Sequence, residues 1–162
     1  MGYFYILDSF TLVVMVTNYH NLEIFHLSYQ LVLKLYPVLN LFPSSENGNL
    51  VIQMKRSAIS IPFNIAEGSS RKTVREFLPF LGYAFGSAKE LEVAFNLSKD
   101  LGFMETQKYT PLYEDLQILI SKLVLFVRDL ELKVPPKKEI VMTQVSRGEN
   151  PWHNSRQNIL KR

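Results

Sequence analysis

One pair of residues has the spacing of a metal-binding motif. Glu23 and His26 form a Glu-x-x-His pair, which places both side chains on one face of a helix. A carboxylate di-iron site in a four-helix bundle needs two such pairs and two further glutamates that point inward. Glu67 and Glu90 offer carboxylates, but the sequence contains no second Glu-x-x-His pair. We therefore expect no metal centre and interpret Glu23 and His26 as ordinary peripheral residues.

Other residue types used in catalysis are scarce or badly spaced. The 162 residues include no cysteine and three histidines, which are His20, His26 and His153. The missing cysteines exclude disulfides, thiolate zinc sites and cysteine nucleophiles. No Gly-x-Ser-x-Gly nucleophile turn and no Gly-rich phosphate loop occurs in the sequence. We expect neither an enzyme nor a bound cofactor.

A stripe of polar side chains recurs every three or four residues in the middle of the sequence. Its members are Gln53, Ser57, Ser60 and Asn64, and it ends near Glu67. Buried polar groups need hydrogen-bond partners. We expect Ser87 to meet Asn64, and Glu90 to meet Arg56. The stripe is either a hydrogen-bonded interface between helices or subunits, or a ligand-binding surface.

Basic residues gather in the same part of the sequence. The candidates for nucleic-acid contact are Lys55, Arg56, Arg71, Lys72 and Arg75. We expect the last three at one end of the molecule and the first two on the helix before them. Phosphate binding strengthens with the number of phosphates neutralised, so an oligomer would multiply the effect. Because Glu46, Glu67 and Glu76 lie in the same stretch, the alternative is a solvated surface of ion pairs.

The net charge of +3 comes entirely from the C-terminal residues. Residues 1–132 contain 11 Lys and Arg against 13 Asp and Glu, a net of −2, whereas residues 133–162 contain seven against two, a net of +5. Residues 133–162 also hold three Pro and one Gly and have no apolar period. We expect a flexible basic tail, either solvated or attracted to phosphates. The pI near 9.1 is therefore no sign that the rest of the chain binds nucleic acid.

The chain between its two ends has the periodicity of helices. Apolar residues three or four apart predict helical segments at about residues 21–41, 49–67, 73–102 and 106–131. The predicted core stripe of the second segment is Val51, Met54, Ala58, Ile61 and Ile65. Four helices with short connections predict an all-α fold, an antiparallel up-down four-helix bundle over residues 19–132.

Several residues mark the expected helix ends. Thr73 and Glu76 have the spacing of a capping box at the start of the third segment. Gly68 suits a left-handed stop of the second segment, and the apolar stripe of the third segment ends at Gly102. Pro111 suits the first turn of the fourth segment, and Pro62 should kink the second.

Residues 1–18 form an apolar N-terminal extension. A secretory signal would need a basic start and a small-residue cleavage site, and both are missing. A membrane span would need ~18–20 apolar residues without a charge, and Asp8 interrupts this run. Met15 offers an alternative start, in which case residues 1–14 are not native. We expect a cytoplasmic protein with no membrane contact.

Two stretches are more apolar than a monomeric bundle requires. Lys34 is the only charged residue between Glu23 and Glu46, and residues 77–85 contain no charge. A helix that is apolar nearly all round must be buried on more than one face. A monomer would leave large apolar patches exposed. We therefore expect the chain to self-associate.

Two strings of the sequence resemble a known family. They are residues 53–68, QMKRSAISIPFNIAEG, and residues 86–103, GSAKELEVAFNLSKDLGF. They are similar to the 23S rRNA intervening-sequence proteins, a family that also carries a ribosomal protein name, and the likeness covers about residues 19–132. Residues 60–68 are its most specific element. Phe25 stands where many members have Trp, and Pro79 is less expected inside the third helix.

The resemblance implies an all-α bundle that assembles as a ring-like homopentamer without known catalytic activity. Some members are encoded within insertions in 23S rRNA genes. The related accessory variability proteins of diversity-generating retroelements bind nucleic acid and a reverse transcriptase. Candidate partners are thus further copies of this chain, rRNA or DNA, and a reverse transcriptase. We expect a non-enzymatic scaffold or accessory protein that contacts nucleic acid; the alternative is a protein-interaction module with no nucleic-acid role.

Overall fold

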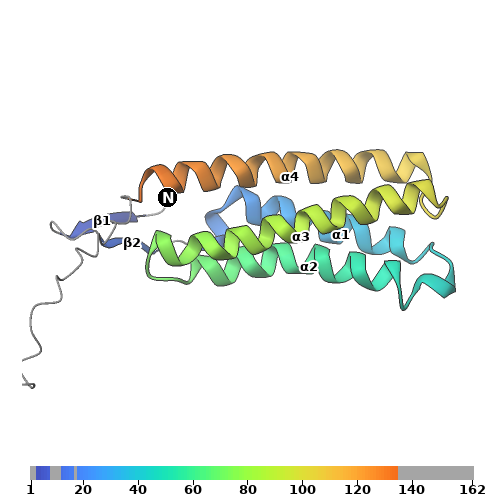
Figure 1. The fold of residues 1–162 in the computed structure, drawn as a ribbon, viewed down its shortest axis with the longest axis horizontal. Helices are drawn as coiled ribbons and strands as arrows, with labels where there is room; N and C mark the ends of the chain where they lie inside the picture. Colours follow the sequence, from blue (N-terminus) through green and yellow to red (C-terminus); the bar gives the residue numbers. More distant parts are fainter. Residues whose placement is uncertain (1–2, 8–11, 17, 135–162) are drawn as a thin grey trace, which may run out of the picture.

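The computed structural model describes residues 3–7, 12–16 and 18–134. Apart from residues 133 and 134, the predicted flexible tail lies outside these residues. The four long helices are α1 (Glu23–Leu39), α2 (Leu50–Ser69), α3 (Val74–Asp100) and α4 (Thr106–Leu132). Two short 3-10 turns, η1 (Tyr19–Asn21) and η2 (Ser44–Glu46), precede α1 and α2. The predicted four-helix bundle is confirmed, because the helices run alternately in opposite directions and α4 packs back on α1 (Figure 1).

Two strands precede the bundle in a region for which the sequence suggested no secondary structure. Strand β1 (Tyr3–Leu7) pairs antiparallel with β2 (Leu12–Val16). In this register Tyr3 lies opposite Val16, and Leu7 lies opposite Leu12. Both segments are rich in aromatic or β-branched residues, which favour strands.

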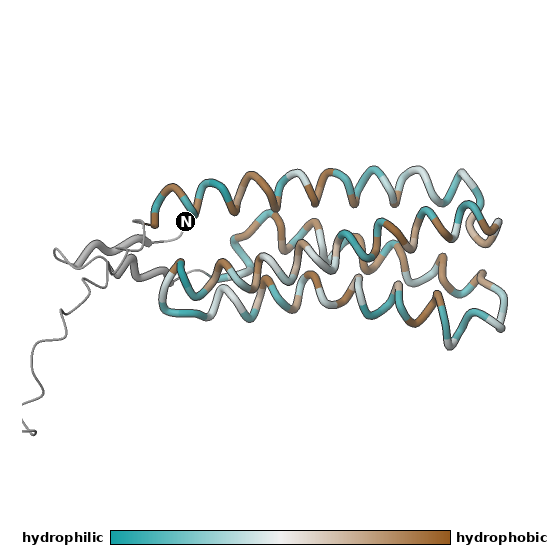
Figure 2. The backbone as a smooth tube through the Cα atoms, viewed as in Figure 1, coloured by the Kyte–Doolittle hydropathy of each residue, from teal (hydrophilic) through white to brown (hydrophobic). Residues whose placement is uncertain are grey.

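The core runs along the axis of the bundle. Hydrophobic and hydrophilic residues alternate along each helix, as amphipathic helices require (Figure 2). All five residues of the stripe predicted for α2 are buried, and four of them have no exposed surface at all. Burying an aliphatic side chain of this size contributes about 1.5–3 kcal/mol. The helical period of the sequence therefore identifies the buried face of α2 correctly.

The structure confirms two predicted helix ends. Thr73 Oγ1 accepts a hydrogen bond from the Glu76 N–H at 3.2 Å, which caps α3. At the other end of α3, Gly102 has a φ of +74°. The N–H groups of Gly102 and Phe103 donate to the carbonyls of Lys99 and Ser98 at 3.0 and 2.8 Å. This is a Schellman motif, which satisfies carbonyls left free at the helix end.

Two other predictions about helix ends are wrong. Pro111 lies in the second turn of α4, because this helix begins at Thr106. Gly68 does not stop α2, which continues to Ser69. A Cβ atom at Gly68 would lie 2.5 Å from Cδ2 of Phe77 and 2.6 Å from Cβ of Phe80. Gly68 is therefore required by the close approach of α3. The helix α2 also continues through Pro62, which is buried within it.

Helices α2 and α3 form the most extensive contact of the bundle. Small buried side chains, Ser57 and Ala58 on α2 and Ala84 and Ala88 on α3, lie along these helices. Small residues let two helix backbones approach closely, so each helix buries more of the other's surface. The pair α2–α3 carries the connecting loop at residues 70–73.

Replacing Gly68 tests this close contact. We expect Gly68→Ala to destabilise the fold by about 1–3 kcal/mol, because overpacking against Phe77 and Phe80 outweighs the better helix propensity of alanine. Gly86→Ala is the matched control within α3, since nothing lies within 4 Å of a Cβ at that position. The control should stabilise by about 0.4–1 kcal/mol. Urea unfolding measures both, and equal effects of the two variants would contradict the account.

Candidate nucleic-acid interface

Three of the five predicted basic residues lie at one end of the bundle, at the connection from α2 to α3. The guanidinium of Arg71 lies 4.4 Å from the ring centroid of Phe80. Its Nη2 atom donates to Glu67 Oε1 at 2.5 Å. These two contacts hold a half-exposed cation in one orientation. Lys72 and Arg75 are exposed beside it.

This connection borders an open hollow of about 570 Å³, lined by Ser70, Arg71, Lys72, Glu76 and Phe80. Glu76 Oε2 accepts a hydrogen bond from the Lys72 N–H at 3.2 Å. Both carboxylates of this region, Glu67 and Glu76, are thus engaged with the loop itself. The hollow offers cations and an aromatic ring to a ligand.

The other two basic residues lie elsewhere. Lys55 Nζ sits 5.4 Å from the ring centroid of Tyr36, on α1. Arg56 is exposed on α2. Thirteen residues separate Arg56 from Ser69 at the end of α2, which is about 20 Å along a helix. The five cations therefore form two groups, one at the connection from α2 to α3 and one further back on α2.

Charge divides between the two halves of the bundle. Residues 19–80 contain six Lys and Arg against four Asp and Glu, a net of +2. Residues 81–134 contain six against eight, a net of −2. The half with α1, α2 and the start of α3 is thus the positively charged one.

Ser57 and Ser60, two members of the polar stripe of α2, bond to α3. Ser57 Oγ donates to Glu90 Oε2 at 3.1 Å. Ser87 Oγ donates to Ser60 Oγ at 2.9 Å, and Asn64 Nδ2 donates to the same Ser60 Oγ at 2.9 Å. Ser87 therefore meets Ser60 instead of Asn64, and Glu90 meets Ser57 instead of Arg56. The other two residues of the predicted polar network, Gln53 and Glu67, lie on the exposed side of α2. Glu67 accepts the hydrogen bond from Arg71.

A second polar cluster, between α3 and α4, was missed by the sequence analysis. The largely buried Glu92 carboxylate accepts hydrogen bonds from Gln117 at 2.7 Å and Tyr113 at 3.3 Å, and it pairs with Lys89. The hydrogen bond from Lys89 lowers the pKa of Glu92 below its usual 4.5, against the effect of burial. Lys89 and Glu92 are three residues apart, and Tyr113 and Gln117 are four apart, so each pair lies on one face of its helix. This spacing was a weak signal that the two faces carry polar groups that could bond to each other.

The Glu-x-x-His pair does not converge on a common point. Glu23 pairs with Lys122 at 3.0 Å, while His26 Nε2 lies 2.7 Å from the backbone oxygen of His20. In the part of the chain that the structure describes, no group of three or more Asp, Glu, His or Cys side chains could hold a metal ion. No helix in that part is long and apolar enough to cross a bilayer.

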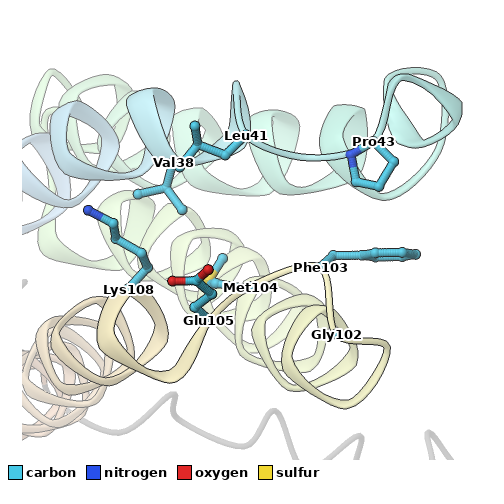
Figure 3. A pocket seen from close by; sticks show the side chains of 8 residues that line it. All are labelled: Val38, Leu41, Pro43, Gly102, Phe103, Met104, Glu105 and Lys108. Atoms are coloured by element: carbon cyan, nitrogen blue, oxygen red, sulfur yellow. The ribbon is translucent and has the colours of Figure 1, made fainter.

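A hollow at the opposite end of the bundle holds about 290 Å³. Val38 and Leu41 lie on one side of it, and Glu105 and Lys108 lie on the other (Figure 3). A third hollow, of about 340 Å³, lies between α3 and α4 and is lined mainly by apolar residues such as Leu78, Phe85 and Val127. Neither hollow brings together the residue types of a catalytic site.

Comparisons with known proteins agree on the fold. Residues 20–124 match the family described as 23S rRNA-intervening sequence protein. A solved structure from Bacteroides thetaiotaomicron, a protein of unknown function from the S23 ribosomal protein family, superposes with a TM-score of 0.60 at 19% identity. The match covers 65% of this chain and 98% of that one. No curated protein matches the sequence.

The Glu92 cluster makes bundle stability dependent on pH. Because the pKa of Glu92 is lowered by folding, its stabilising contribution is fully present above about pH 4.5 and is lost as pH falls through the folded pKa. We expect Glu92→Gln to remove this part of the acid sensitivity. Urea unfolding between pH 3 and 7 measures it. Parallel stability curves for wild type and Glu92→Gln below pH 4.5 would contradict the assignment.

Proposed function

The chain belongs to the 23S rRNA-intervening sequence protein family, and we propose that it is a cytoplasmic, non-enzymatic, homo-oligomeric scaffold that contacts rRNA or other nucleic acid. The observation that carries the nucleic-acid part is the basic connection between α2 and α3. Arg71, Lys72 and Arg75 lie within five residues there, and Phe80 holds Arg71 in place. A cation fixed as Arg71 is binds a phosphate with less ordering cost than a free side chain does.

Exposed apolar residues support self-association. On the outer face of α4, Ile118, Leu125 and Leu132 are 50%, 60% and 88% exposed. Their spacing of seven residues is that of a seam along which one helix packs against another. By resemblance to the family, the assembly we propose is a ring-like pentamer, which would repeat the basic connection around the ring.

A second candidate function is a protein-interaction module with no nucleic-acid role. The apolar face of α4 favours it, since the same seam can bind a helix of a different protein. A reverse transcriptase is the candidate partner in this case. The two functions differ in what the basic connection does, so nucleic-acid binding separates them.

Light scattering at micromolar concentration tests the assembly. We expect five times the subunit mass of 18.8 kDa, about 94 kDa. Leu125→Lys should dissociate the oligomer if α4 forms the seam, because it places a charge in an apolar contact. A wild-type mass of one subunit would contradict self-association. An unchanged mass for Leu125→Lys would show that α4 does not form the contact between subunits.

Salt-titrated binding to a labelled 23S rRNA fragment tests the nucleic-acid contact. We expect measurable affinity at ~50 mM salt that falls steeply by ~200 mM. Replacing Arg71, Lys72 and Arg75 together by Gln should weaken binding and flatten the salt dependence, because phosphate contacts are lost. The matched control replaces Lys99, Lys108 and Lys122 by Gln, which changes the net charge equally in the acidic half.

Three results of that titration would contradict the proposal. Absence of binding at ~50 mM salt would favour the protein-interaction module. Equal losses in both triple variants would show a general effect of net charge. Loss of binding on deletion of residues 133–162, with no effect of the first triple variant, would assign the contact to the basic tail.

A further inference from the structure

A chain of aromatic rings covers the start of α1. Its four members lie in the spatial order His20, Tyr19, Phe25 and Tyr29. The ring centroid of Tyr19 lies 4.1 Å from that of His20 and 4.6 Å from that of Phe25. Phe25 and Tyr29 stack at 5.9 Å with an interplanar angle of 29°. These rings play no part in the chemistry described above.

The two ends of this ring chain are exposed and the middle is anchored. Tyr19 and Phe25 are partly buried and pack against the core. Tyr29 is 49% exposed, and His20 is exposed as well. Packing against the core accounts for Tyr19 and Phe25. It does not account for the aromatic rings of His20 and Tyr29, which are exposed to solvent.

Hydrogen bonds hold the outer part of the chain in place. Asn18 Oδ1 accepts from the His20 N–H at 3.0 Å, and the ring of His26 lies within 2.7 Å of the His20 carbonyl oxygen. The backbone that carries the His20 ring is therefore fixed from both sides. Rings that are ordered before binding lose little conformational freedom when a ligand stacks on them.

The rings and the basic connection lie at the same end of the bundle. The turn η1, which carries Tyr19 and His20, contacts α2. Because α1 and α2 are antiparallel, the start of α1 lies at the end where α2 leads into α3 (Figure 1). The carboxylates nearest in sequence are engaged, Glu23 with Lys122 and Glu67 with Arg71. This end of the bundle therefore carries both exposed aromatic faces and cations.

We infer that this end of the bundle binds unpaired nucleotides of a single strand. Bases stack on the exposed faces of His20 and Tyr29, while Arg71 and Lys72 hold the phosphates. This inference rests on the proposed nucleic-acid contact and names its substrate class. In a duplex the base faces are covered by neighbouring base pairs, so they cannot stack on these rings. The cations attract the phosphates of a duplex equally well.

Paired substitutions separate stacking from simple apolar contact. His20→Leu with Tyr29→Leu removes both rings and keeps an apolar surface, whereas His20→Phe with Tyr29→Phe keeps both rings. The full-length protein is titrated by fluorescence anisotropy at ~50 mM salt with a 12-nucleotide oligoadenylate and with a 12-base-pair RNA duplex. Stacking of one base changes affinity by about 5- to 150-fold.

We expect the leucine pair to bind the single strand at least about 5-fold more weakly than wild type does. It should bind the duplex as wild type does. The phenylalanine pair should bind both probes as wild type does. Equal single-strand affinity of the leucine pair and wild type would overturn the stacking and leave the phosphate contact standing. Wild type that binds neither probe would overturn the nucleic-acid contact itself. A changed mass of the leucine pair in light scattering would overturn the inference by assigning the rings to a subunit interface.

Discussion

The close contact between Gly68 and the first turns of α3 is the constraint on which the rest of the structure depends. Two aromatic side chains, Phe77 and Phe80, lie where a side chain at position 68 would otherwise be. The short loop at residues 70–73 must therefore turn sharply, and Arg71 comes to lie over Phe80. Hydrogen bonds from Ser57 and Ser87 continue the same contact toward the other end. Packing and the position of the basic loop thus have one physical origin.

The two halves of the bundle are then suited to different contacts. The half with α1 and α2 carries the positive charge, the anchored Arg71 and the ring chain at the start of α1. The half with α3 and α4 is acidic and exposes an apolar seam on α4. The proposed function assigns phosphate contact to the first half and apolar partners to the second.

Local patterns predicted the bundle well, but contacts between helices could not be predicted from them. The period of apolar residues locates all four helices, and Thr73 and Gly102 mark ends through interactions within a few residues. In the sequence Gly68 looks like a helix stop. Its actual role depends on contacts with Phe77 and Phe80, which belong to the next helix. Pro111 suits a first turn, but the turn before it is also helical.

The candidate site shows the same division between local and distant information. The polar residues of α2 were recognised, but their partners on α3 depend on the register of two helices, which one sequence does not contain. The Glu92 cluster joins residues more than twenty positions apart, and the ring chain depends on the turn η1 before α1.

Photocrosslinking of the full-length protein to a uridine-containing single strand tests the central claim most directly, because it locates the nucleic acid on the molecule. Peptides that carry the crosslinked nucleotide are identified by mass spectrometry. The account predicts crosslinks in residues 19–29 and 70–80, at the shared end of α1, α2 and α3. Crosslinks confined to residues 133–162, or to the acidic surface of α3 and α4, would contradict it.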